Sequence, residues 1–140
     1  MASRIVDAWV ASVGSGGQFV GVSRYLKSMN PKIKCYAVEP YNAAVLSENE
    51  LVDMGKHIIQ GTGYSIVPPK FDYSICDGII RIKDDDCRRS TIALSQKEGC
   101  YVGYSAGANV EAAKRILDLA NKKINVATVL CDTAFKYSDL

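Results

Sequence analysis

Two glycine-rich turns contain the residues whose types and spacing best suit ligand chemistry. Residues 14–18 (GSGGQ) follow an apolar run, and residues 103–107 (GYSAG) follow Tyr101 and Val102. Each turn lies between a strand-like run and a helix-like pattern. Backbone N–H groups at such a turn can close around an anion at the positive end of a helix. Two such turns in one short chain predict a ligand with two recognisable ends.

The first turn allows several interpretations. It lacks the third glycine of a dinucleotide-binding fingerprint, and no Gly-Lys-Ser/Thr follows it as in a nucleotide-binding P-loop. A cradle for a phosphate monoester remains, since this needs only N–H donors and a hydroxyl. The alternative is a tight turn that caps the following helix.

The second turn matches the G-x-S-x-G pattern of the nucleophile elbow of serine hydrolases, with Ser105 at its centre. In α/β-hydrolases the acid and then the histidine follow the serine, but the only histidine, His57, precedes Ser105. Asp132 is the only acid near a later strand end. A serine hydrolase is therefore the less favoured alternative, and His57 is expected to be a surface or loop residue.

Length and composition indicate one globular domain over residues 1–140. The chain is 48% hydrophobic and 23% charged, with a net charge of +2 and no cluster of basic and aromatic residues. Nucleic acid is therefore not expected as a partner. No apolar run is long enough to span a membrane, and Asp7 interrupts the N-terminal one, which argues against a signal peptide. We expect a cytoplasmic protein.

The cysteines and acidic residues predict neither a disulfide framework nor a metal site. The five cysteines are odd in number and form no C-x-x-C pair, which is typical of reduced core residues in an intracellular protein. Three consecutive aspartates favour a helix N-terminus over a metal site. The cysteines are Cys35, Cys76, Cys87, Cys100 and Cys131. The consecutive aspartates are Asp84, Asp85 and Asp86.

Alternating periodicities predict an α/β fold, a three-layer sandwich with a mostly parallel sheet covered on both faces. Strands are expected at residues 5–13, 34–38, 73–82, 99–104 and 126–131, and helices at 17–29, 42–47, 84–97 and 106–122. Residues 48–71 are expected to be mostly loop. The predicted buried stripes are Phe19, Val22, Leu26 and Met29 in one helix and Val110, Ala113, Leu117 and Ala120 in another. Ligands bind at the carboxyl ends of such strands.

Five segments, in the same order and spacing, resemble the C-terminal half of cysteine synthase and cystathionine β-synthase. They are residues 10–27 (VASVGSGGQFVGVSRYLK), 36–40 (YAVEP), 59–63 (IQGTG), 98–108 (EGCYVGYSAGA) and 132–137 (DTAFKY). These fold type II enzymes use pyridoxal phosphate. The resemblance covers nearly the whole chain and implies the large domain of that fold.

The resemblance also implies roles for individual residues. Ser105 would hydrogen-bond the pyridine nitrogen of the cofactor, and Asp132 and Thr133 would lie beside the ring. The loop of Gly61, Thr62 and Gly63 would face the substrate. The phosphate would be held by Gly14, Ser15, Gly16, Gly17 and Gln18.

The implied reaction is β-replacement on an activated serine, serine or cysteine, with sulfide, cyanide or a thiol as nucleophile. A neutral hydroxyl at the pyridine nitrogen does not hold that nitrogen protonated, which suits loss of a β-substituent more than transamination. The resemblance thus implies a small amino acid as the substrate class.

Several departures limit what the resemblance implies. Gln18 stands where the family usually has threonine, Cys131 where proline is common, and Phe135 where a polar residue is usual. The family's Schiff-base lysine and its Thr-Ser-Gly-Asn loop belong to the N-terminal half, and neither pattern occurs here. Without that lysine we expect a truncated, catalytically incompetent form with no catalytic residue, which does not bind the cofactor stably alone.

Two other classes of function remain open. A non-catalytic chain would pair with full-length subunits, and we expect a homo-oligomer, such as a dimer, or a partner of a longer homologue. Co-purification with such a homologue would favour this class. Labelling of Ser105 by a fluorophosphonate would favour the hydrolase.

Overall fold

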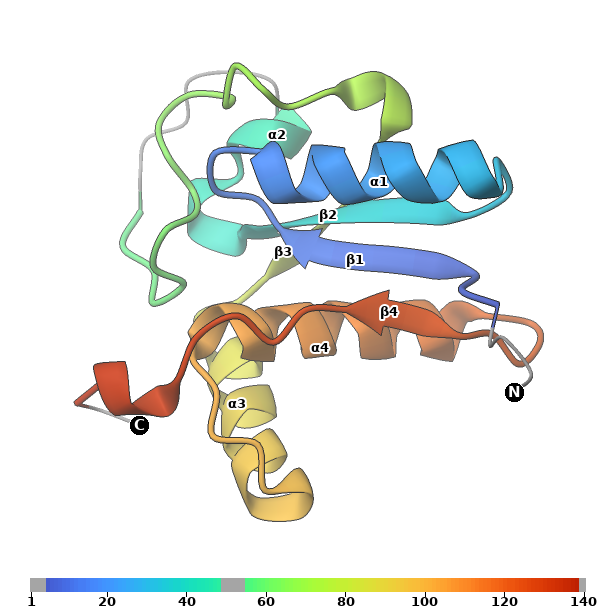
Figure 1. The fold of residues 1–140 in the computed structure, drawn as a ribbon. Helices are drawn as coiled ribbons and strands as arrows, with labels where there is room; N and C mark the ends of the chain where they lie inside the picture. Colours follow the sequence, from blue (N-terminus) through green and yellow to red (C-terminus); the bar gives the residue numbers. More distant parts are fainter. Residues whose placement is uncertain (1–4, 49–54, 139–140) are drawn as a thin grey trace.

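A four-stranded parallel sheet forms the centre of the molecule (Figure 1). The structure, a computed structural model, describes residues 5–48 and 55–138. The strands lie in the order β3-β2-β1-β4. Their bounds are β1 Ala8–Ser12, β2 Lys34–Pro40, β3 Gly78–Ile82 and β4 Val126–Thr128.

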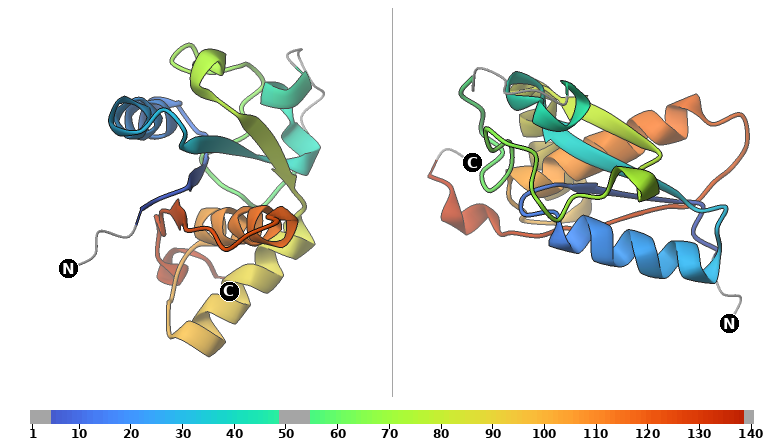
Figure 2. Two further views of the ribbon diagram at one scale, coloured as in Figure 1. Left: turned by 90° about the vertical axis from the view of Figure 1, so that its right-hand side faces the viewer. Right: turned by 90° about the horizontal axis from the view of Figure 1, so that it is seen from above.

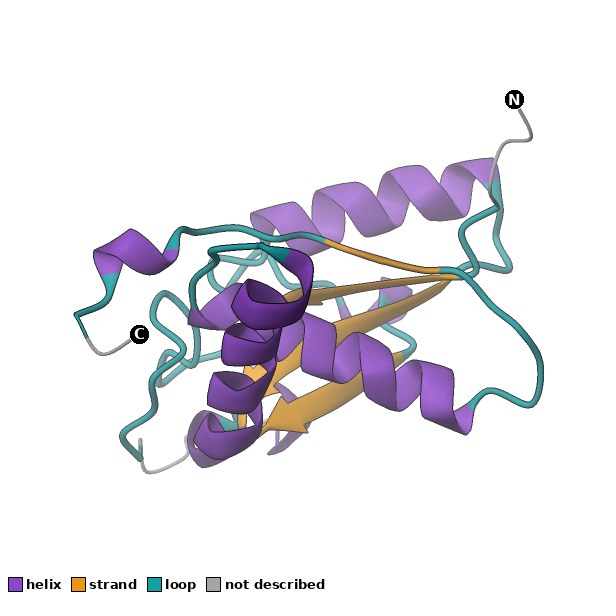
Figure 3. Ribbon diagram, turned by 90° about the horizontal axis from the view of Figure 1, so that it is seen from below, coloured by secondary structure: helices purple, strands orange, loops and turns teal. Residues whose placement is uncertain are grey.

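Helices cover both faces of this sheet, as the alternating pattern predicts. Helix α1 lies on one face, and Figures 2 and 3 show α3 and α4 on the other. The bounds are α1 Gly17–Met29, α2 Val45–Glu48, α3 Asp84–Glu98 and α4 Tyr104–Leu119. Short 3-10 turns occupy Tyr41–Ala43, Tyr73–Ile75 and Ala134–Lys136. The predicted three-layer α/β fold is confirmed.

Alternate residues of the central strands fill two separate cores. Trp9 and Ala11 of β1 pack with Phe19 on the α1 side. Val10 packs with Tyr104 on the α4 side. Because successive side chains of a strand point to opposite faces, a nearly continuous apolar run is what a doubly covered strand requires.

The buried faces of α1 and α4 agree only in part with the predicted stripes. In α4 the fully buried positions include Ala108 and Ala112, whereas Leu117 is 45% exposed. In α1, Phe19 is buried and Val22 and Leu26 pack against the same core, as predicted, but Met29 is 70% exposed. Helix α4 packs tightly against α3: a Cβ at Gly107 would overlap the hydroxyl of Thr91. Small residues therefore face inward where backbones approach, and larger ones lie at the margin.

Residues 99–104 do not form a strand of the sheet, contrary to the sequence prediction. Gly99 adopts the left-handed conformation that ends α3, with φ at 68°, and α4 begins at Tyr104. Only Val102 makes a β-bridge there, antiparallel to Thr133. The glycine C-cap and the early helix start leave too few residues for a strand.

Other predicted boundaries also shift. The strand predicted over residues 73–82 begins with the 3-10 turn Tyr73–Ile75, in which Asp72 accepts the Ser74 N–H. Only Gly78–Ile82 pairs in the sheet. The short helix predicted at 42–47 is divided between Tyr41–Ala43 and Val45–Glu48. Residues 55–71 contain neither helix nor strand, as predicted, and residues 49–54 lie outside the described part of the chain.

The cysteines are free, but only two are core residues. Cys35 and Cys87 are buried, and burial raises the pKa of the Cys87 thiol to about 12. Cys76 and Cys100 are half-buried and Cys131 is exposed, so the core assignment is wrong for Cys131. Among the described helices, none is long and apolar enough to cross a membrane.

Asp77 joins the end of α1 to the start of β2. Its bonds should stabilise the fold at neutral pH and lose this effect in acid. Its carboxylate accepts hydrogen bonds from Lys27 Nζ (2.6 Å), Lys34 Nζ (3.0 Å) and the Cys35 N–H (2.8 Å). Burial alone would raise the pKa of Asp77, but these three donors outweigh it and hold the pKa below its usual value. A carboxyl whose pKa is lower in the folded state stabilises the fold above its unfolded pKa of about 3.9.

We expect Asp77→Asn to lower the free energy of unfolding at neutral pH by about 1–3 kcal/mol. The difference between variant and wild type should shrink as the pH falls below about 4 and through the lower folded pKa, where wild-type Asp77 also becomes neutral. Urea unfolding at several pH values measures this. A difference that is the same at every pH would show that Asp77 acts without its charge.

Candidate functional site

The first glycine turn forms a shallow cradle at the carboxyl end of β1 and the start of α1. Gly16 is the N-cap of α1 and has φ at +85°, a conformation that side chains with a Cβ rarely adopt. A cavity of about 200 Å³ is lined by this turn and its flanks: Ser12, Val13, Gly14, Ser15, Gly16, Gln18 and Phe19. The N–H groups of the first turn of α1 have no acceptor within the helix, so the cradle suits an anion.

The loop predicted to face the substrate packs directly against this cradle. A Cβ at Gly14 would overlap the carbonyl oxygen of Gly61. Gly61 and Gly63 both have positive φ, and the Thr62 hydroxyl between them donates to the carbonyl of Ile59 at 2.7 Å. Thr62 is buried, so its side chain fixes the turn and does not reach into solvent.

The second glycine turn lies beside the segment after β4. The Gly103 N–H donates to the carbonyl of Asp132 at 3.1 Å, next to the bridge between Val102 and Thr133. A Cβ at Gly103 would lie 2.7 Å from the ring of Tyr137. Ser105 is half-buried in the first turn of α4, and among the described residues its hydroxyl makes no hydrogen bond. The structure thus brings Ser105, Asp132 and Thr133 to one place.

Asn109 connects the two glycine turns, and sequence reasoning did not select it. Its side chain is fully buried; Oδ1 accepts from the Ser12 N–H at 2.7 Å, and Nδ2 donates to the Val129 carbonyl at 2.9 Å. Ser12 immediately precedes the cradle, and Val129 precedes Asp132. Asn109 stands four residues after Ser105 and so on the same helix face, which is a signal that could have drawn attention to it.

Asp132 is ionised and held within its own segment. Hydrogen bonds from Lys136 (2.8 Å) and from the Tyr137 hydroxyl (2.9 Å) lower the pKa of Asp132. Burial, followed by the Asp132 carboxylate, raises the pKa of Tyr137 to about 12. Thr133 caps the 3-10 turn that follows, where its Oγ1 accepts from the Phe135 N–H.

The residues of the serine hydrolase hypothesis do not form a catalytic triad in this structure. His57 packs on the loop of Gly61, Thr62 and Gly63, where its Nε2 is the atom nearest to a Cβ built at Gly63. It is a loop residue, as predicted, but half-buried, with a buried Nδ1 that has no partner among the described residues. No hydrogen bond in this part of the chain joins His57 or Asp132 to Ser105, whereas a catalytic triad requires such bonds.

Glu39 is a second buried polar residue that sequence reasoning did not place in the site. It is 2% exposed, and its carboxylate accepts the N–H groups of Leu46 (2.8 Å) and Ser47 (3.1 Å). Arg81 Nε lies 3.8 Å from the same carboxylate. Glu39 therefore fixes α2 to the carboxyl end of β2, beside the loop that carries Gly63.

The residues present fit the phosphate end of pyridoxal phosphate. Gly14 and Gly16 leave the space and backbone conformation that a Cβ would remove, and the cradle lies at the positive end of α1. Ser105 offers a neutral hydroxyl at the second turn. Asn109 ties together the two turns that the sequence assigns to the two ends of one ligand.

Comparison with known proteins relates this chain to enzymes that depend on pyridoxal phosphate. The family model of pyridoxal-phosphate-dependent enzymes matches residues 1–132. Cysteine synthase 3 of Caenorhabditis elegans is 40% identical over 96% of this chain, which covers 38% of that protein. Cysteine synthase of Helicobacter pylori is 36% identical over 94% of this chain and 42% of its own length.

Solved structures share the fold closely. The crystal structure of an O-ureido-L-serine synthase superposes with a TM-score of 0.90 and 31% identity over 99% of this chain and 43% of that one. The crystal structure of the O-acetylserine-dependent cystathionine β-synthase of Helicobacter pylori superposes with a TM-score of 0.88 and 34% identity. The match covers 96% of this chain and 43% of that one. The chain spans about two fifths of the length of these relatives. It belongs to the family of pyridoxal-phosphate-dependent enzymes.

Proposed function

We propose that this chain supplies the phosphate and ring-nitrogen sites of a pyridoxal-phosphate-dependent β-replacement enzyme of sulfur amino-acid metabolism. The observation that carries the proposal is the contact between the two loops: Gly14 approaches the carbonyl of Gly61 so closely that no side chain fits between them. The cradle and the substrate-facing loop therefore form one surface. The similarity to cysteine synthases supports the substrate class, a small amino acid with a β-leaving group.

The residues of the chain would divide the binding of the cofactor between them. The N–H groups at the start of α1, with the Ser15 hydroxyl and the Gln18 amide, would bind the phosphate dianion. Ser105 would hydrogen-bond the ring nitrogen without charging it. When bound, pyridoxal phosphate supplies an electron-withdrawing ring that stabilises negative charge on the substrate. Thr133 and Asp132 would border the ring, and Asp132 stays ionised through Lys136 and Tyr137.

We propose further that these 140 residues alone do not catalyse the reaction. Lys136 contacts Asp132 beside the proposed ring site, but its ammonium is held by that carboxylate at 2.8 Å. Lys70 lines an apolar hollow beside Gly14 and Ser15 without a defined partner there. Neither stands in the sequence context of the family's cofactor-binding lysine, and a covalent link to the cofactor needs a free amine placed at its aldehyde.

Borohydride reduction after mixing with pyridoxal phosphate, followed by mass mapping, tests this proposal. We expect no single lysine to be modified stoichiometrically, and no sulfide-dependent consumption of O-acetylserine. One stoichiometric adduct together with turnover would overturn the claim of inactivity. Loss of both signals in a Lys136→Gln or Lys70→Gln variant would then identify the lysine.

We propose that the chain self-associates or pairs with a longer homologue. Exposed apolar side chains support this proposal: Leu119 is 83% exposed and Leu130 is 44% exposed. The rings of Tyr101 and Phe135 stack at 5.8 Å although they are 60% and 87% exposed. Surface of this kind marks interaction sites. Light scattering of the dilute chain should give a mass above that of the monomer, and a strictly monomeric chain at all concentrations would contradict self-association.

A further inference from the structure

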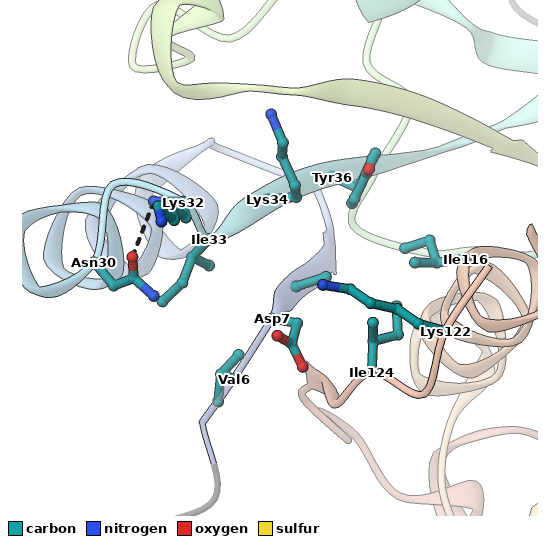
Figure 4. Close-up of a pocket in the computed structure, with 11 residues that line it drawn as sticks. Val6, Asp7, Asn30, Lys32, Ile33, Lys34, Tyr36, Ile116, Lys122 and Ile124 are labelled. Atoms are coloured by element: carbon teal, nitrogen blue, oxygen red, sulfur yellow. Dashed lines mark hydrogen bonds between the residues drawn. The ribbon is translucent and has the colours of Figure 1, made fainter. Parts of the chain in front are cut away.

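A second cavity lies at the amino ends of β1 and β2, the end of the sheet opposite to the glycine turns (Figure 4). Its volume of about 320 Å³ is within the range of about 300–1,000 Å³ that is typical of small-molecule sites. Residues from four segments form its walls. The apolar lining is Val6, Ala8, Ile33, Tyr36, Ile116 and Ile124, and the polar lining is Asp7, Asn30, Lys32, Lys34 and Lys122.

The charged residues of this cavity differ in how they are engaged. Lys34 is paired with Asp77 at 3.0 Å, and Figure 4 shows it pointing away from the other lining residues. Asp7 Oδ2 accepts the Asn125 N–H at 2.8 Å, which leaves Oδ1 without a partner among the described residues. Lys122 has no ion pair in the described part of the chain, and in Figure 4 its ammonium points toward β1. Lys32 also has no ion pair among the described residues, but Figure 4 shows it beside Asn30 and apart from Asp7. The Asp7 carboxylate and the Lys122 ammonium therefore line the same cavity without neutralising each other.

We propose that this cavity binds a free α-amino acid with a branched aliphatic side chain. The ligand's ammonium would bind Asp7, and its carboxylate would bind Lys122. The side chain would contact Ile33, Ile116 and Ile124. An apolar acid without an amine would leave the Asp7 carboxylate unpaired, and an apolar amine would leave Lys122 unpaired, so a zwitterion is the ligand that satisfies both charges.

This site is separate from the proposed cofactor site and does not depend on it. Asp7 and Asn125 are held together by backbone and side-chain bonds: the Asp7 and Ala8 N–H groups both donate to the Asn125 carbonyl, at 2.9 and 3.2 Å. Lys34 N–H donates to the Asp7 carbonyl at 3.0 Å. The anionic side of the cavity is therefore built on sheet backbone and not on a surface loop alone.

Amide NMR of the isotope-labelled chain, without cofactor, tests the proposal with three probes. L-Leucine should shift the amides of residues 6–8, 33–36 and 122–125. 4-Methylpentanoate, which lacks the amine, and 3-methylbutylamine, which lacks the carboxylate, should each bind about tenfold more weakly or worse. If either analogue bound as tightly as leucine, only one charge would be recognised and the proposal would be overturned. Leucine shifts confined to other residues would also overturn it, as would the absence of any shift at millimolar leucine.

Two variants and two controls complete the test. Lys122→Gln and Asp7→Asn should each weaken leucine binding by about tenfold, and asparagine keeps an oxygen acceptor for the Asn125 N–H. Lys97→Gln, in the last turn of α3, should bind leucine as the wild type does. Gly14→Ala, which alters the cradle, should also leave leucine binding unchanged. Leucine binding that is lost in Gly14→Ala but retained in Lys122→Gln would assign the amino acid to the substrate site instead.

Discussion

Replacing Gly14 with alanine is expected to abolish the binding of inorganic phosphate at residues 14–18. The new methyl group would overlap the carbonyl oxygen of Gly61, which is backbone and cannot rotate away as a flexible side chain could. The cradle and the loop that carries Gly61 must then separate, and the N–H donors no longer converge on one anion. Phosphate binding, measured by amide NMR titration, should weaken by about tenfold or more.

Gly21→Ala is the matched control for this substitution. Gly21 lies within α1, and a Cβ there meets nothing within 4 Å. Alanine in a helix interior should stabilise the chain by about 0.5–1 kcal/mol and leave phosphate binding unchanged. A Gly14→Ala chain that binds phosphate as tightly as the Gly21→Ala chain would show that the contact between the loops does not shape the cradle.

Asn109→Leu is expected to lower the free energy of unfolding by about 2–5 kcal/mol. Leucine has a similar size but cannot accept from the Ser12 N–H or donate to the Val129 carbonyl, and both groups would remain buried without these partners. The loss should be large because Asn109 is fully buried, so water cannot replace the missing bonds at no cost. Urea unfolding followed by circular dichroism measures it.

Asn121→Ala serves as the control, since Asn121 is exposed beyond the end of α4. This substitution should change stability by no more than about 0.5 kcal/mol. If Asn109→Leu were equally neutral, the two glycine turns would not depend on this side chain for their relative position. Phosphate binding by Asn109→Leu at a temperature where it stays folded would then match the wild type.

The elements that the sequence predicted best are those governed by local rules. The apolar run of β1, the glycine turn and α1 follow one another without a competing signal, and the boundary prediction for α1 agrees with Gly17–Met29. The three aspartates begin α3, as their place at a positive helix end predicts. The parallel sheet follows from the alternation of strands and helices.

The errors arose where tertiary contacts decide between local alternatives. Residues 99–104 were apolar enough for a strand, but the left-handed Gly99 and the helix start at Tyr104 left only the bridge at Val102. In α4, hydrophobicity favoured Leu117 for the core, whereas close packing against α3 selected alanine and glycine. No sequence period can express how closely two helices approach.

The candidate site was predictable in its glycines and less so in its supporting polar residues. Gly14 and Gly16 belong to the glycine-rich turn of residues 14–18. Glycine is needed there because a Cβ at Gly14 would overlap the Gly61 carbonyl and because Gly16 has a positive φ. Asn109 and Glu39 act through bonds to segments that are 97 and 7–8 residues away in sequence. Their importance comes from complete burial with satisfied hydrogen bonds, which only the folded chain shows.

We expect 4-deoxypyridoxine 5′-phosphate to contact both glycine turns, because it has the phosphate and pyridine ring of the cofactor but no aldehyde to react with lysine. Titrated into the isotope-labelled chain at millimolar concentration, it should shift the amides of residues 14–18 together with those of Ser105 and Thr133. Inorganic phosphate should shift only the first group. Saturable binding that leaves residues 14–18 unshifted, or a ring that leaves Ser105 and Thr133 unaffected, would contradict the assignment of these two turns to the two ends of the cofactor.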